Sequence, residues 1–200
     1  VIILTKEVSS FSSLKLQLDI CMNILAHCGQ EEQTRLRLIE TVDLEMFESE
    51  IYSKHHFDKI SESVLLIGEK REITRTAVKA MVEAEDTIEL PATSPYGEIL
   101  VNTDKCTLCL ACVSLCPTNA LEDNADKPEL NFTETACIQC GICLTTCPEQ
   151  AITLNPRLNL KNEALGQRTL NAEEPFECIS CKRPFGVKST IERIVSKLEN

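Results

Sequence analysis

Eight cysteines arranged as two copies of one motif constrain this sequence more than any other feature. The motif C-x2-C-x2-C-x3-C-P begins at Cys106 and begins again 31 residues later at Cys137. The prolines that end the two copies, Pro117 and Pro148, are related by the same offset. Self-similarity at a fixed offset indicates a duplicated structural unit.

The spacing within each copy resembles that of bacterial-type 2[4Fe-4S] ferredoxin domains, and the resemblance covers roughly residues 95–156. It implies two [4Fe-4S] clusters, each held by three cysteines of one copy and the last cysteine of the other. The ligands implied for cluster 1 are Cys106, Cys109, Cys112 and Cys147, and those for cluster 2 are Cys137, Cys140, Cys143 and Cys116. The apolar shell around the clusters is expected from Leu108, Leu110, Leu115, Phe132, Ile138 and Ile142.

Two zinc sites or a disulfide framework are the alternatives for these eight cysteines. Zinc sites typically use two C-x2-C pairs separated by a loop, rather than three ligands at x2 spacing and a fourth followed by proline. Disulfides belong to oxidising compartments, and the sequence shows no secretory signal. The spacing therefore favours iron–sulfur clusters.

A longer stretch resembles a narrower group of proteins. Leu90-Pro91 through Tyr96-Gly97, Cys106-Thr-Leu-Cys109 and Cys147-Pro148-Glu149 are similar to the C-terminal part of large bacterial iron–sulfur proteins often encoded near formate dehydrogenases. Those proteins carry further ferredoxin modules upstream of an α/β segment. The resemblance implies that this chain is a fragment of a multi-cluster protein and that its redox partner is a formate dehydrogenase-type oxidoreductase.

The cysteines and a Pro-rich connector at 90–97 divide the chain into three segments. We predict an α/β segment at 1–90, a 2[4Fe-4S] ferredoxin domain at 91–158, and a C-terminal Cys-pair and helix segment at 159–200. The fold class predicted is therefore α+β.

Charge and hydropathy limit the partners. The formal net charge is −11, which argues against a nucleic-acid partner bound through phosphates. Residues 98–155 alone hold eight acidic and two basic side chains, and this acidic surface favours a basic patch on the redox partner. The sequence contains no apolar run of 18 residues, so a membrane span is not expected. We expect a cytoplasmic, reducing location.

Hydrophobic periodicity predicts the elements of the first segment. A buried strand is expected at 1–4, followed by a helix capped by Ser9 or Ser10 and stopped by Gly29. The apolar stripe of this helix is predicted at Leu14, Leu18, Cys21, Leu25 and Cys28. Further predictions are a strand at 35–40, helical pieces over 43–68, and a helix at 70–84 that buries Ile73, Ala77, Ala80, Met81 and Ala84.

In the other segments, the strands 99–101 and 152–154 are predicted to pair and close the ferredoxin module. A last helix is predicted with a capping box of Ser189 and Glu192 and an apolar stripe at Ile191, Ile194, Val195 and Leu198.

Cys178 and Cys181 form a late C-x2-C pair that resembles half of a zinc-ribbon or treble-clef site. The other two ligands would come from residues beyond Asn200 or from a second chain. If there are none, the two thiols are free or form a disulfide.

The sequence thus predicts an electron-transfer protein or subunit rather than an enzyme by itself. With one thiolate for each iron, the clusters are expected to carry electrons rather than bind substrate. One alternative is a non-catalytic assembly, regulatory or redox-sensing protein. Another is an enzyme whose α/β segment holds a substrate or cofactor, although no Gly-rich phosphate loop is found.

Overall fold

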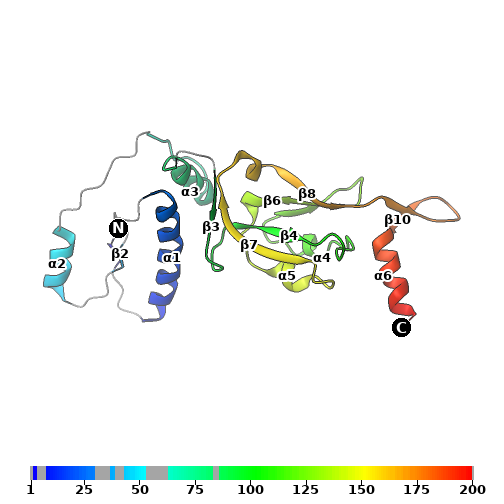
Figure 1. The fold of residues 1–200 in the computed structure, drawn as a ribbon, viewed down its shortest axis with the longest axis horizontal. Helices are drawn as coiled ribbons and strands as arrows, with labels where there is room; N and C mark the ends of the chain where they lie inside the picture. The colour runs from blue at the N-terminus through cyan, green and yellow to red at the C-terminus, as the bar shows by residue number, and fades with distance from the viewer. Residues whose placement is uncertain are drawn as a thin grey trace. The chain divides into compact units, whose positions relative to one another are not determined.

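The computed structural model describes residues 2–3, 8–29, 37–38, 43–52, 63–82 and 86–199. These residues divide into two compact units, Val1–Thr93 and Ser94–Asn200. The fold is α+β, with short strands and helices in both units (Figure 1).

The first unit contains three helices and three short strands within its described residues. The strands are β1 (Ile2–Ile3), β2 (Arg37–Leu38) and β3 (Thr87–Glu89), and the helices are α1 (Val8–His27), α2 (Leu44–Tyr52) and α3 (Lys70–Lys79). Strands β1 and β2 pair in parallel, as expected for an α/β segment. Gly29, at φ +70°, follows α1 and stops it as predicted.

Several details of this unit differ from the sequence predictions. Helix α1 begins at Val8, so Ser9 and Ser10 lie inside it and do not precede it as caps. Its buried side chains are Ile20 and Ile24, whereas Cys21 is exposed. Leu14, Leu18, Leu25 and Cys28 of the predicted stripe are half-buried, so the stripe is correct in part, but the most buried positions lie one residue before Cys21 and Leu25.

Helix α3 is shorter than predicted, and Ile73, Ala77, Ala80 and Met81, which were predicted to be buried, are half-buried. It ends at Lys79, and its buried side chains are Arg75 and Val78. Ala84 lies outside the described residues, as do 53–62 of the segment expected to be helical in pieces. Glu72 accepts a hydrogen bond from the backbone N–H of Glu69 at 3.1 Å, which secures the start of the helix.

The second unit is built from two antiparallel arrangements. Strand β4 (Gly97–Val101) pairs with β7 (Ile152–Asn159), with Ile99 opposite Leu154 and Val101 opposite Ile152. This pairing confirms the predicted closure of the module. Strand β6 (Glu129–Thr133) lies between β5 (Leu121–Asp123) and β8 (Gln167–Ala172).

A short helix contains the third cysteine of each motif, Cys112 in the first copy and Cys143 in the second. Helix α4 (Ala111–Ser114) belongs to the first copy and α5 (Ile142–Thr146) to the second, and Figure 1 shows both beside β4 and β7. Two 3-10 turns, η1 (Glu134–Ala136) and η2 (Asn162–Leu165), connect the strands. The core buries Ile99, Leu121, Leu130, Phe132 and Ile152 between these elements.

The C-terminal segment is a hairpin and a helix. Strands β9 (Pro175–Glu177) and β10 (Pro184–Val187) pair antiparallel and lead into α6 (Lys188–Leu198). The helix begins before Ser189, with Val187 as its N-cap residue, so the predicted Ser189–Glu192 capping box is wrong. Ile194, Val195 and Leu198 of the predicted stripe are exposed.

Among the described residues, no helix is long and apolar enough to cross a membrane.

Candidate iron–sulfur sites

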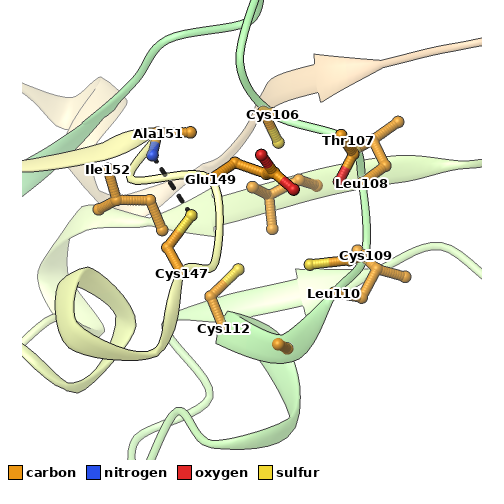
Figure 2. A pocket seen from close by; sticks show the side chains of 12 residues that line it. Cys106, Thr107, Leu108, Cys109, Leu110, Cys112, Cys147, Glu149, Ala151 and Ile152 are labelled. Atoms are coloured by element: carbon orange, nitrogen blue, oxygen red, sulfur yellow. Dashed lines mark hydrogen bonds between the residues drawn. The ribbon is translucent and has the colours of Figure 1, made fainter. Parts of the chain in front are cut away.

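The eight motif cysteines line two separate cavities. Cys106, Cys109, Cys112 and Cys147 line one, which we call the cluster 1 site. Figure 2 shows their four sulfurs turned toward the same space. Cys116, Cys137, Cys140 and Cys143 line the other, the cluster 2 site. These are the two sets that the sequence resemblance implied, and binding of the clusters themselves stays a prediction.

Each site takes its last cysteine from the other copy of the motif. Cys116 follows α4 of the first copy but lies at the cluster 2 site, and Cys147 follows α5 but lies at the cluster 1 site. The two copies therefore interlock, and neither site is complete without the other copy.

Left-handed backbone at matching positions wraps the chain around each site. Leu108 and its counterpart Gln139 have φ values of +49° and +54°. Leu110 and its counterpart Gly141 follow at +57° and +77°, each as the N-cap residue of its helix. This conformation is open to glycine but costs about 1–2 kcal/mol for a residue with a Cβ, so the loop at Leu110 is held by its surroundings.

Burial, together with the charges of neighbouring sulfurs, raises the pKa of two enclosed thiols. Burial, followed by the charges of Cys106, Cys109 and Cys143, raises the pKa of Cys112 to about 12. Burial and the charges of Cys137, Cys140 and Cys116 raise the pKa of Cys143 to about 11. Several thiolates held this close repel one another, and iron cations between them would remove that cost.

Hydrogen-bond donors point at the sulfurs from outside the cavities. The backbone N–H of Ala151 donates to Sγ of Cys147 at 3.3 Å (Figure 2). Burial opposes the thiolate of Cys116, but N–H groups of Leu121, Thr118 and Ala120 outweigh it and lower the pKa of this cysteine. Such donors suit sulfur ligands that carry the negative charge of a cluster, so the residues present fit [4Fe-4S] groups.

The predicted apolar shell is only partly closed. Leu108 and Phe132 are buried in the core, and Leu110 packs against it. Leu115, Ile138 and Ile142 are instead exposed, so the cluster 2 site has apolar side chains at the protein surface.

A buried ion network beside the cluster 2 site had no signal in the sequence. Arg157 on β7 contacts Glu98 at 2.5 Å and Glu134 at 2.8 Å, and both carboxylates are buried. Burial opposes ionisation of Glu134, but hydrogen bonds from Arg157 and Asn159 and the nearby positive charges lower its pKa below the ordinary value. The network fixes β4 and β7 around the site.

Cys178 and Cys181 lie in the turn of the β9–β10 hairpin, apart from both cluster sites. The N–H of Cys178 donates to the carbonyl of Arg183, and the N–H of Lys182 donates to the carbonyl of Cys178, both at 2.9 Å. N–H groups of Cys181 and Ser180 lower the pKa of Cys178. Within the described part of the chain, no three His, Cys, Asp or Glu side chains form a group that could hold a single metal ion.

Two family models match the cysteine-rich segment. Residues 97–152 match a family model described as a 4Fe-4S dicluster domain. Residues 136–185 match a second model with the same description, and the two matches share the second motif. These matches indicate iron–sulfur electron transfer.

The other comparisons add a distant structural likeness. The comparison with curated proteins found no match. Among solved structures, the chain is similar to one from the membrane-bound sulfane sulfur reductase, an archaeal respiratory membrane complex, with 18% sequence identity and a TM-score of 0.31. That likeness covers 62% of this chain and 56% of the other.

Proposed function

We propose that the chain relays single electrons through two [4Fe-4S] clusters to or from a larger oxidoreductase. The observation that carries this proposal is the grouping of eight sulfurs into two sets of four. Four thiolates per cluster give each iron a protein ligand. No iron is then open to a substrate, which suits electron transfer and not Lewis-acid chemistry.

The placement of the two sites supports an internal relay. The charge of Cys143, at the cluster 2 site, acts on Cys112 at the cluster 1 site, so the two sites are neighbours. When bound, each cluster takes up or releases one electron. The interlocked motifs hold the two sites at a fixed separation.

We infer that the partner presents a basic surface and belongs to the formate dehydrogenase type, and that the exchange takes place in the cytoplasm. The support for a basic surface is the excess of acidic side chains around the clusters. The support for the enzyme type is the resemblance of residues 90–149 to iron–sulfur proteins encoded near formate dehydrogenases.

Anaerobic purification of the chain, with iron, sulfide and zinc analysis, tests the cofactor content. About eight irons and about eight sulfides per chain are expected, and reduction should give the electron paramagnetic resonance (EPR) spectrum of two spin-coupled [4Fe-4S] clusters. About four irons, or zinc in place of iron, would contradict the proposal.

A matched pair of variants tests the ligand sets. Cys116→Ser, at the cluster 2 site, should lower the iron content or change the EPR signal of cluster 2 alone. Cys178→Ser combined with Cys181→Ser should leave about eight irons, because the hairpin pair lies apart from both cavities. Equal loss in both variants would count against the assignment.

The runner-up is a non-catalytic assembly, regulatory or redox-sensing protein whose clusters do not pass electrons on. Anaerobic mixing of the reduced protein with an oxidised formate dehydrogenase, compared with an acidic control acceptor, separates the two functions. Faster oxidation by the dehydrogenase supports the relay. Clusters that cannot be reduced would favour the runner-up.

We also propose that Cys178 and Cys181 supply half of a zinc site in the intact protein. Two backbone N–H groups directed at Cys178 favour the thiolate, which is the form that binds zinc. Zinc that is lost in the Cys178→Ser, Cys181→Ser variant while iron stays constant would support this site. A zinc-free intact protein would exclude it.

A further inference from the structure

The duplication allows the surroundings of the two cluster sites to be compared position by position. Three residues with positive φ in the first copy, Leu108, Leu110 and Asn119, have counterparts 31 residues later. Those counterparts, Gln139, Gly141 and Gln150, also have positive φ. The backbone is thus repeated, and a side chain that differs between counterparts changes the surroundings of one cluster only.

Gln139 gives the cluster 2 site a donor that the cluster 1 site lacks. Its Nε2 lies 3.5 Å from Sγ of Cys137 and donates to the carbonyl oxygen of Glu98 at 2.9 Å. The contact with the carbonyl orients the amide, because an oxygen in that place would face another oxygen. The counterpart is Leu108, a buried side chain with no polar atom.

The structure makes room for Gln139. A Cβ at Gly97 would lie 2.6 Å from Cδ of Gln139 and 2.5 Å from the carbonyl oxygen of Asn155. The glycine at the start of β4 therefore lets the amide reach between the strand and the sulfur. The contact spans 41 residues of sequence, from Glu98 to Gln139.

A second pair of counterparts, Thr118 and Glu149, also differs in whether the side chain can donate a hydrogen bond to a sulfur. Thr118 places its hydroxyl 3.8 Å from Sγ of Cys116, and a sulfur bound to iron can only accept. At the matching position of the other copy is Glu149, whose side chain lines the cluster 1 site (Figure 2). Arg193 at 2.8 Å and Lys197 at 3.8 Å both pair with this carboxylate and offset its charge, so the two sites differ here in the donor that Thr118 supplies and Glu149 does not.

Hydrogen bonds to the sulfurs and nearby charges both act on the potential of a cluster. Reduction adds one negative charge, which a hydrogen-bond donor to the sulfur stabilises. We propose that the two clusters have unequal reduction potentials, that of cluster 2 being the more positive, and that Gln139 is the main residue that separates them. This rests on the proposed electron-transfer function and adds a direction to it, since an electron on the chain settles at cluster 2.

Redox titration of the intact chain, followed by EPR, tests the inference. The protein should titrate in two steps. Gln139→Leu, which copies Leu108, should move the more positive step downward and leave the other in place. The expected change in electron distribution between the clusters is about tenfold, which is about 59 mV for one electron.

Three further variants keep the test sharp. Leu108→Met, which is nearly volume-conserving at the matching position, should leave both steps unchanged. Thr118→Val and Gln139→Glu each remove a hydrogen-bond donor from cluster 2 and should also lower the potential of the more positive step. These two variants test the inference even if the Gln139→Leu protein fails to assemble its clusters. Iron content of each variant must stay at about eight per chain.

The outcomes separate this inference from the proposed function. Two reducible clusters that titrate together, or a Gln139→Leu protein with unchanged potentials and full iron, would overturn the inference and leave the relay intact. A wild-type protein without reducible clusters would overturn the relay itself.

Discussion

Arg157 holds together the strands that frame the cluster 2 site. Its guanidinium lies between the carboxylates of Glu98 and Glu134, whose side chains are 6% and 8% exposed. Glu98 also pairs with Arg168, which lies over the ring of Phe132. A buried charge is tolerated where it is paired, and Arg157 is the cation that the two carboxylates share.

Replacing this guanidinium should be costly. Arg157→Met is expected to leave two buried carboxylates without their shared partner and to lower the stability by about 3–5 kcal/mol. The measurement is the denaturant midpoint, followed both by far-UV circular dichroism and by cluster absorbance, because a cofactor protein need not unfold in one step.

Arg168→Met is the matched control, because Arg168 pairs with the same Glu98 but is 43% exposed. Exposed ion pairs contribute little, so its loss of stability should be much smaller. Equal losses in the two variants would show that Arg157 has no special role in the network.

At the scale of elements, α6 lies against the loop that carries the cluster 1 cysteines. Thr190 donates to the carbonyl of Thr107, and the N–H of Ser189 donates to Glu173 at 3.2 Å. Arg193 and Lys197 both contact Glu149, which follows the last cysteine of that site. The helix is therefore attached by polar contacts, while much of its predicted apolar stripe is exposed.

Removing one of these contacts should loosen the helix. Arg193→Gln is expected to speed amide hydrogen exchange across 188–198 by about two- to fivefold, the effect of an exposed or half-exposed ion pair. Lys188→Gln is the control, because the partner of Lys188 within the described ranges is Glu192 of the same helix, in an exposed i,i+4 contact. Exchange that rises equally in both variants would mean that the contact with Glu149 does not hold the helix.

For the whole molecule, the net charge of −11 sets how it meets a partner. Acidic side chains such as Asp104, Glu122 and Asp123 are exposed on the cluster-bearing unit. If the partner is basic, opposite charges steer the encounter, and salt screens that attraction.

The second-order rate of electron transfer to the partner should therefore fall as ionic strength rises. Stopped-flow mixing at about 0.05–0.3 M salt measures it, and a small neutral acceptor, whose rate should change little, is the control. A rate that rises with salt would exclude a basic docking surface.

The sequence by itself determined the parts of this protein that depend on local spacing. The repeated C-x2-C-x2-C-x3-C-P motif carries the resemblance to 2[4Fe-4S] ferredoxin domains, and that resemblance implied the two sets of sulfurs that line the two cavities. The short segments 99–101 and 152–154, one before the first motif and one after the second, were predicted to pair, and β4 and β7 do so.

Only the tertiary structure decided what surrounds those sulfurs. The contacts of Gln139 with Glu98, of Arg157 with Glu134 and of Arg193 with Glu149 join residues 23–44 positions apart, and no local pattern signals them. The most buried positions of α1 and the start of α6 were mispredicted for a related reason. Propensity and periodicity are weak where several registers are apolar, and packing then selects one.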